Sequence, residues 1–249
     1  MAMCSWHRPI AIHFDRIAHG YDLLTDWTSH AELFQDIVSC VECGPILDVG
    51  SGPGTLASQL GAKLPEGTLI ASLDCSLNMC LNARIKGLRI IHGVGENLPL
   101  GRSSIRTIVC RQALHYLDPE RSLSEWCRVL QVGGTVVVSQ SVSDDIQSTR
   151  WWRSVKAVVQ PLRRSWWSNL ELERLLSRHG LEVEACKSRW IFNRRPKSQF
   201  LINAALGPLE AEKVLEEWVH SSPSSVAFAV EGEIVSFRQF WVTYKAVRP

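Results

Sequence analysis

The residues best suited to ligand chemistry stand in the segment ILDVGSGPGT, residues 46–55. Apolar residues flank the carboxylate of Asp48, and glycines then follow at every second position. Glycine lets a backbone adopt unusual dihedrals and approach a ligand closely, and a helix that starts at such a turn offers free N–H groups to a polar ligand. Asp48 is expected to orient this loop, and the candidate binding groups are the backbones of Gly50, Ser51, Gly52 and Gly54.

A second carboxylate, Asp74, ends the apolar run TLIASLD about one strand–helix–strand unit further along the chain. Dinucleotide-type folds place the carboxylate that binds the ribose hydroxyls at this point. Asp is also a good helix cap, so Asp74 could instead cap a helix beginning at Ser76. The glycine spacing alone is compatible with a turn that binds nothing. A Walker-type phosphate loop is excluded, because no Gly-Lys-Ser/Thr follows.

The elements that must position these residues alternate along the chain. The hydrophobic pattern predicts helices between successive strands, the helices over 55–63, 76–85 and 119–130 and the strands over 45–49, 69–73, 88–92, 105–110 and 134–140. Such alternation favours a parallel sheet covered on both faces. Ligands of open α/β sheets lie at the carboxyl ends of the strands, so residues just past the first four strands are the site candidates.

Four segments carry a more specific signal together than any one alone: FDRIAHGYDLL (14–24), ILDVGSGPG (46–54), GENLPL (95–100) and ALHYLDPERSLSEWCRVLQVGG (113–134). In this order they resemble the class I S-adenosylmethionine-dependent methyltransferases, in the branch of the ubiquinone and menaquinone biosynthesis enzymes and other small-molecule methyltransferases. The resemblance implies a Rossmann-like, doubly wound, mostly parallel seven-stranded sheet with helices on both faces, N-terminal helices and an inserted lid. It also implies S-adenosyl-L-methionine as the cofactor.

The strand ends supply further expected cofactor contacts. Cys75 and Met79, after the second strand, could flank the adenine ring, and the residues expected from the ends of the third and fourth strands are Gly95, Glu96, Arg111 and Gln112. The resemblance adds Tyr21, which is expected to close over the methionine end. Two of these assignments have a structural alternative: Tyr21 as a packing aromatic and Glu96 as an anchor of its own loop.

The chain departs from the family pattern at the adenine end. The family often has an Asp that accepts a hydrogen bond from the adenine amino group, and this chain has Val94 there. Adenine is therefore expected to depend on backbone groups and apolar packing. The family's usual Phe-Asp reads Ile105-Arg106, and the Pro of its Lys-Pro-Gly-Gly turn is Val132. These departures keep open a relative whose cofactor plays an altered role.

Methyl transfer needs the acceptor atom held behind the methyl carbon and water excluded. A general base is needed only where the acceptor must lose a proton. His115 is the candidate catalytic residue, because it follows the fourth strand and histidine titrates near neutral pH. A structural role for His115 is the alternative, and Tyr116 is a weaker candidate base.

The length of 249 residues fits a single methyltransferase domain, 1–249, with elaborations. Its expected parts are an N-terminal helical cap (1–44), a cofactor-binding core (45–142), a lid or substrate region with a late helix (143–200), and C-terminal helices and a strand (201–249). The late helix and a sixth strand are expected within 165–186. Two further helices, in SQFLINAALG and PLEAEKVLEEWVHS, precede a final strand over 234–247.

Composition favours a cytoplasmic protein. The net charge is +2, no apolar run approaches a membrane span, and the N-terminus lacks the pattern of a secretory signal. The eight cysteines are scattered, and Cys40-x-x-Cys43 has no second pair to complete a metal site. No metal is therefore expected.

Basic residues and tryptophans interleave within 147–170 and 187–197. Three interpretations are open: a solvated basic face with half-buried tryptophans, a lid whose tryptophans wall a substrate while an Arg holds a carboxylate or phosphate, and a nucleic-acid or anionic-membrane patch. The near-neutral net charge disfavours the third.

The sequence thus predicts methyl transfer from S-adenosylmethionine to the oxygen, carbon or nitrogen of a small, apolar or aromatic metabolite. The alternatives are a non-methylating cyclase or isomerase on the same fold and an RNA methyltransferase that uses the basic, tryptophan-rich segment. The acceptor and the oligomeric state are not predicted.

Overall fold

The computed structural model describes residues 5–249, which form two compact units. Unit 1 takes in the chain up to residue 140, together with residues 173–187 and 243–249. Unit 2 takes in residues 141–172 and 188–242. The expected core, 45–142, thus lies almost wholly in unit 1, and most of the expected lid region, 143–200, lies in unit 2.

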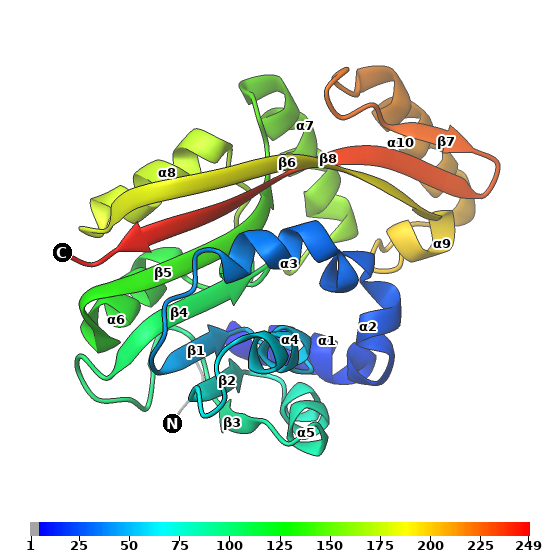
Figure 1. The fold of residues 1–249 in the computed structure, drawn as a ribbon. Coiled ribbons are helices and arrows are strands. Elements are labelled where there is room, and N and C mark those ends of the chain that lie inside the picture. Colours follow the sequence, from blue (N-terminus) through cyan, green and yellow to red (C-terminus); the bar gives the residue numbers. More distant parts are fainter. Residues whose placement is uncertain (1–4) are drawn as a thin grey trace. The chain divides into compact units, whose positions relative to one another are not determined.

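The sheet of unit 1 begins with parallel strands, as predicted (Figure 1). β1 (Ile46–Val49) lies between β2 (Ile70–Asp74) and β4 (Ile105–Arg111), while β3 (Arg89–His92) pairs with β2 and β5 (Leu130–Val142) with β4. The register sets Val49 beside Leu73 and Asp48 beside Val109. The carboxyl ends of β1, β2 and β4 therefore reach the same edge of the sheet.

The remaining strands complete a mostly parallel, Rossmann-like sheet. They are β6 (Glu182–Pro196), β7 (Ala229–Glu231) and β8 (Ile234–Val247). Among the residues described, the sheet has eight strands in the order β3-β2-β1-β4-β5-β8-β6, with β7 antiparallel to β8. Strands β5, β6 and β8 each run from one unit into the other.

The helices of unit 1 include the predicted ones over 55–63, 76–85 and 119–130. They are α1 (His7–Ile17), α2 (Tyr21–Leu24), α3 (Ala31–Val38), α4 (Thr55–Lys63), α5 (Leu77–Ile85) and α6 (Pro119–Val129), with short 3-10 turns at Ala18–Gly20, Asp26–Ser29 and Leu114–Tyr116. Asp118 accepts a bond from the backbone of Arg121 and precedes Pro119, which fixes the start of α6. Helix α8 (Asn169–Arg178) crosses between the units.

One apolar cluster holds α3 and α4 on the sheet of unit 1. Fully or almost fully buried side chains from the two helices meet those of β1, β4 and β5, and they are Ile37, Leu56, Leu60, Ile46, Val109 and Val137. Burying each such side chain contributes about 1.5–3 kcal/mol relative to exposure. This packing fixes both ends of the glycine-rich turn, because the turn joins β1 to α4.

Unit 2 has an aromatic core of its own. Its helices are α7 (Ile146–Val159), α9 (Lys197–Phe200) and α10 (Pro208–Ser221), and Asp145 with Ser148 forms a capping box at the start of α7. The buried rings of this core belong to Trp151, Trp152, Trp166, Phe200, Trp218, Phe228 and Phe237. Several tryptophans of the basic segment thus pack inside unit 2 instead of facing solvent.

Several element boundaries differ from the predicted ones. Strand β5 starts at Leu130 instead of 134, because Leu130 already pairs with Ile105 of β4. The register then shifts, and the next pair is Thr107 with Thr135. Gly133, which lies within the shifted stretch, has φ of +72°. Strand β6 extends past residue 186 to Pro196. Of the helix expected in SQFLINAALG, only the short α9 forms. Strand β7 was not predicted.

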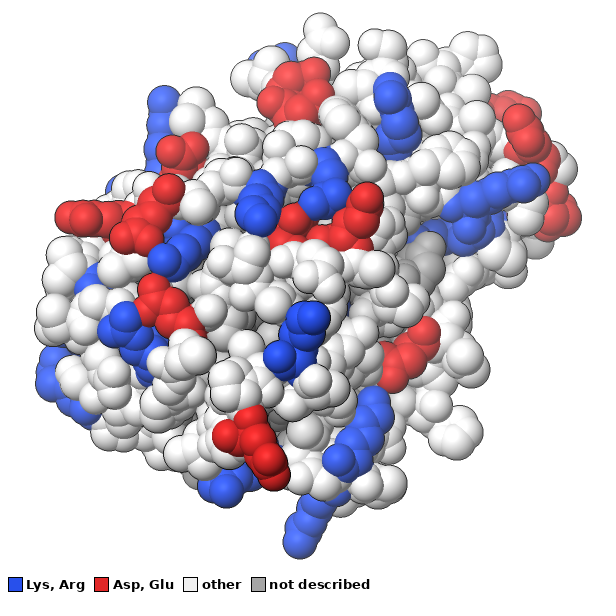
Figure 2. Space-filling model, in the orientation of Figure 1, with Lys and Arg blue, Asp and Glu red and all other residues white. Residues whose placement is uncertain are grey.

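Charge is mixed on the face of the molecule drawn in Figure 2, where Lys and Arg lie interspersed with Asp and Glu. Within residues 5–249, no helix has the length and apolarity that crossing a bilayer requires. The described cysteines, Cys40 and Cys43 among them, are free thiols.

Candidate functional site

The glycine-rich turn is bonded to the end of β2. The N–H groups of Gly50 and Ser51 both donate to the carbonyl of Leu73, at 2.8 and 3.0 Å. The N–H of Gly52 donates to Oδ2 of Asp74 at 2.8 Å, and the N–H of Ser76 donates to Oδ1 at 2.9 Å. Asp74 is therefore held at the edge where the turn opens. The cap of α5 is Ser76, whose hydroxyl accepts from Met79, so Asp74 does not cap this helix through its own side chain.

The glycines of the turn have two different functions in the structure. Gly52 has φ of +55°, and a side chain there would meet nothing closer than Tyr21, at 3.7 Å. Gly54 has φ of +79°, and a Cβ there would lie 2.3 Å from Leu88 and 3.0 Å from Ala83. Gly52 thus exposes backbone to open space, whereas Gly54 lets α4 start close against α5.

A cavity that is partly open to solvent lies over this edge of the sheet, entirely within unit 1, and its volume is about 840 Å³ when the open solvent at its mouth is included. The predicted cofactor residues that line it are Tyr21, Asp48, Gly50, Ser51, Gly52, Asp74, Cys75, Met79, Gly95, Arg111 and Gln112.

Two buried ionisable side chains, Asp48 and Arg111, line the cavity. Asp48 is 1% exposed, and its Oδ2 has no hydrogen-bond partner among the described residues. Burial raises the pKa of Asp48 to about 7, although the nearby Arg111 acts to lower it. Arg111 is also buried; its Nη1 donates to the carbonyl of Thr28 at 3.3 Å, and its guanidinium lies 5.2 Å from the ring of Trp27. The site therefore offers a ligand one guanidinium group and one carboxyl group whose pKa is about 7.

Aromatic rings line another part of the cavity. Phe14 meets Tyr116 edge to face at 5.2 Å between centroids and meets Tyr21 at 6.2 Å. Burial, followed by the neighbouring Tyr116 and Asp74, raises the pKa of Tyr21 above its usual value, so the hydroxyl stays protonated and can donate. These rings offer an apolar, aromatic surface beside the polar turn.

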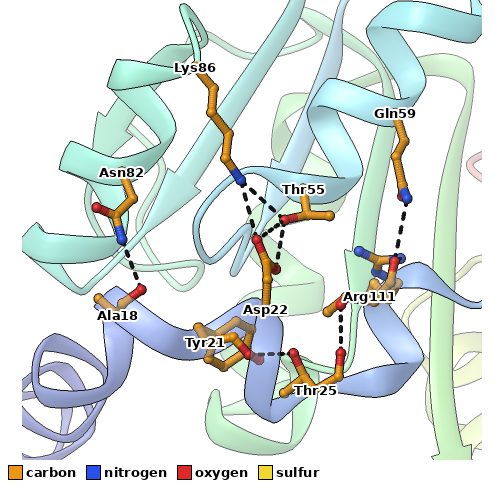
Figure 3. A network of polar contacts seen from close by, with 10 residues as sticks. Ala18, Tyr21, Asp22, Thr25, Thr55, Gln59, Asn82, Lys86 and Arg111 are labelled. Atoms are coloured by element: carbon orange, nitrogen blue, oxygen red, sulfur yellow. Dashed lines mark hydrogen bonds and ion pairs between the residues drawn. The ribbon is translucent and has the colours of Figure 1, made fainter.

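The N-terminal helices are tied to the core beside this cavity (Figure 3). Asp22 on α2 accepts from the hydroxyl of Thr55 at 2.8 and 2.9 Å, and its carboxylate lies 3.4 Å from Nζ of Lys86. The side chain of Asn82 donates to the carbonyl of Ala18 at 2.9 Å. These bonds join α2 and the turn before it to α4 and α5, and so they position Tyr21.

The backbone at Gln112 takes a left-handed conformation, with φ of +52°. This conformation is uncommon for a residue other than glycine and tends to occur at functional sites. Its N–H donates to the carbonyl of Ser139 at 2.9 Å, which holds the exit of β4 at the edge of the cavity.

Burial raises the pKa of the Cys75 thiol, which also lines the cavity, and this disfavours a reactive thiolate there.

Three predicted site residues do not line the cavity: Gly54, Glu96 and His115. Glu96 lies 3.1 Å from Nε2 of His7 and accepts from the N–H of Asp118 at 2.7 Å, so it anchors its loop. His115 is 3% exposed, and its Nδ1 lies 2.8 Å from Nε2 of Gln140. An amide NH₂ can only donate, so Nδ1 accepts here. This geometry favours the structural alternative for both residues.

Sequence reasoning missed part of the cavity wall. His7, Ile10, Trp27 and Thr28 line it, and all four come from the N-terminal helices and turns. Trp27 lies in a short 3-10 turn that has no periodic pattern. Its position could not be predicted from sequence, since it depends on the contact with Arg111.

Part of the chain is similar to known proteins. Residues 47–138 match the family described as "Methyltransferase domain". The chain is similar to a malonyl-[acyl-carrier protein] O-methyltransferase of Methylococcus capsulatus, with 26% identity over 222 residues that cover 76% of this chain and 80% of the relative. It is also similar to a methyltransferase of Mycobacterium tuberculosis of uncharacterised function, with 29% identity over 46% of each chain.

Solved structures share the fold. A protein of Bacillus halodurans, itself proposed to be a methyltransferase, superposes with a TM-score of 0.73 at 21% identity, covering 88% of this chain and 98% of the other. A geranyl diphosphate C-methyltransferase of Streptomyces coelicolor, solved with Mg²⁺, geranyl diphosphate and S-adenosyl-L-homocysteine, superposes with a TM-score of 0.65 at 14% identity over the whole of both chains. At these identities the likeness establishes the fold alone.

Proposed function

We propose that the cavity of unit 1 binds S-adenosyl-L-methionine and presents its methyl group to a small apolar or aromatic acceptor. The premise is that the chain is a class I S-adenosylmethionine-dependent methyltransferase. The observation that carries the proposal is the convergence of the glycine-rich turn and Asp74 at one cavity edge, joined by the bond from Gly52. Open backbone at Gly52 and a carboxylate at the end of the neighbouring strand are what a nucleoside with a charged amino-acid arm requires.

The donor set fits the cofactor. Asp74 has accepting capacity left after its two backbone bonds, because an ionised carboxylate offers about four lone-pair sites, and it would hold the ribose hydroxyls. Gly50, Ser51 and Gly52 would approach the amino-acid arm. Arg111 suits its carboxylate, and the unpartnered Oδ2 of Asp48 suits its positive charge.

The adenine end has no acidic side chain at the position of Val94, which lines the cavity. Adenine would therefore bind through apolar packing against Val94 and Met79 and through backbone groups near Gly95. The carbonyl of Gly95 already accepts from Trp126 at 3.0 Å, which fixes this loop.

The cofactor supplies the electrophilic methyl group and its leaving group. The chain contributes position and a dry environment: Phe14, Tyr21 and Tyr116 form an aromatic wall that would orient an apolar acceptor and exclude water. His115 does not line the cavity, whereas Tyr21 and Tyr116 both do, and each would offer a hydroxyl to the acceptor. The reaction then depends on orientation more than on a general base.

Calorimetric titration of the full chain with S-adenosyl-L-methionine and S-adenosyl-L-homocysteine tests the proposal. We expect saturable binding of both. Heat-silent titrations with no thermal stabilisation at millimolar ligand would contradict it. Labelled methyl donor would then be offered with acceptors of the kinds that relatives use, an acyl-carrier-protein thioester of malonate and geranyl diphosphate, and with aromatic metabolites. Binding without transfer to any acceptor would favour the non-methylating alternative.

A further inference from the structure

Unit 2 contains a buried lysine that has no anionic partner. Lys156 on α7 is 7% exposed. Among residues 5–249, no hydrogen bond or ion pair to its ammonium occurs. Its Nζ lies over the ring of Trp152, 4.8 Å from the centroid, and 5.7 Å from that of Trp166. Such cation–π contacts offset only part of the cost of burying an unpaired charge.

Two arginines increase this imbalance. The charges that act on Lys156 are those of Arg163 and Arg195, and both add to burial in lowering its pKa well below the ordinary value. The guanidinium of Arg163 lies 4.3 Å from the ring centroid of Trp166, and that of Arg195 lies 5.5 Å from that of Phe237. Three basic side chains thus share one aromatic-lined region, and no carboxylate acts on the lysine.

Three carboxylates of unit 2 are engaged elsewhere: Glu171 pairs with Arg153 at 2.9 Å, Glu212 pairs with Lys197 at 2.9 Å, and Asp145 caps α7. No carboxylate among the described residues acts on Lys156, so an anion that balances its charge would come from outside the chain. The surrounding rings lower the local dielectric, so an anion brought there would interact strongly with all three cations.

We propose that Lys156, Arg163 and Arg195 form a binding site for a phosphate-class oxyanion, either inorganic phosphate or the phosphate or diphosphate group of an ester. Three cations match a multiply charged oxyanion better than a single carboxylate. Arginine forks and a lysine point charge are the usual groups that bind phosphate. The site lies wholly within unit 2, so the proposal goes beyond methyl transfer and stands independently of the cofactor cavity.

Thermal unfolding of the full chain with added phosphate or pyrophosphate tests the site, with sodium chloride at equal ionic strength as the reference. We expect saturable stabilisation above the chloride reference, stronger with pyrophosphate than with phosphate and weakest with acetate. Stabilisation by acetate equal to that by pyrophosphate would overturn the phosphate class, and no stabilisation above chloride would overturn the site.

The variant Lys156→Met keeps the apolar stem and removes the charge. We expect it to weaken pyrophosphate binding at least about tenfold, a change in binding free energy of about 1.4 kcal/mol, and to unfold at a higher temperature than the wild type when no anion is present. The matched control is Lys213→Met, which removes an exposed lysine from α10 and should change neither quantity. If Lys156→Met bound pyrophosphate as tightly as the wild type, the proposal would fail, whatever the variant's stability.

Proton uptake on anion binding distinguishes a lysine that binds the anion from a lysine that only packs in the core. Sulfate is a tetrahedral oxyanion that does not titrate near neutral pH, so calorimetry with sulfate in two buffers of different ionisation enthalpy reports protons taken up by the protein. We expect uptake on binding in the wild type and none in Lys156→Met, because the bound anion favours the ammonium form. Equal uptake in both would contradict the assignment to Lys156.

Discussion

Asp74 joins two structural elements and is also proposed to bind the ribose, so its substitution needs a matched control. We expect Asp74→Ala to weaken S-adenosylmethionine binding by about 1–3 kcal/mol, the loss of hydrogen bonds to a charged group, measured by calorimetry. Ser76→Ala is the control: it removes the cap of α5 but keeps the carboxylate. Equal losses in both variants would mean that Asp74 acts through the helix and not on the ligand.

Asp48 gives unit 1 a pH dependence whose sign follows from its pKa. The folded-state pKa of about 7 lies above that of an unfolded aspartate, about 3.9. Its stabilising contribution is therefore fully present below about pH 4 and is lost as the pH rises to about 7. Each unit of difference corresponds to about 1.4 kcal/mol.

Asp48→Asn should remove this dependence. We expect the free energy of unfolding of the variant, relative to wild type, to rise between pH 4 and pH 7, measured by urea unfolding. The exposed carboxylate variant Glu66→Gln in the same unit serves as the control. A difference between Asp48→Asn and wild type that stays constant across this range would show that Asp48 is ionised throughout.

Val94 tests the adenine end. Val94→Asp should tighten S-adenosylmethionine binding if a carboxylate there can accept from the adenine amino group, by up to about 1.5–3 kcal/mol. Inosine-type analogues, which lack that amino group, should show no gain. A variant that binds both ligands more weakly would place the adenine away from Val94.

At the scale of elements, the link between α2 and α4 holds Tyr21 at the cavity. Thr55→Val removes the hydroxyl that Asp22 accepts and keeps the shape of the side chain. We expect faster hydrogen exchange over residues 18–29 and weaker cofactor binding, by about 0.5–1.5 kcal/mol, the net value of a hydrogen bond. The control is Thr68→Val, because the hydroxyl of Thr68 donates only within its own turn. Unchanged exchange over 18–29 would show that other contacts suffice to hold α2.

Most elements of unit 1 could be predicted because local patterns determine them. Apolar runs such as Ile46–Val49 marked buried strands, and the hydrophobic pattern over 119–130 marked α6. The start of β5 could not be predicted, because it depends on the pairing of Leu130 with Ile105 across the sheet. Strand β7 is short and depends on its partner β8 in the same way.

The candidate site was predictable to the extent that strand ends determine it. Residues past β1, β2 and β4 line the cavity, as expected for an open α/β sheet. Glu96 and His115 follow the third and fourth strands as well, but their side chains turn toward buried partners, His7 and Gln140. Such orientations are set by packing between distant segments, which sequence position does not reveal.

At the scale of the whole molecule, the two units separate the proposed activities: cofactor binding belongs to unit 1 and the oxyanion site to unit 2. The sequence pattern grouped the tryptophans with the basic residues of the lid region, and the structure places most of these rings in the core of unit 2. Lys156 lies buried against two of these rings, those of Trp152 and Trp166, and it is the centre of the proposed oxyanion site.

A crystal structure of the chain with S-adenosyl-L-homocysteine tests the central claim most directly. The account predicts the ligand in the cavity of unit 1, with its ribose on Asp74 and its amino-acid arm over Gly50 to Gly52. A ligand bound elsewhere, or a turn filled by the protein's own side chains, would contradict it.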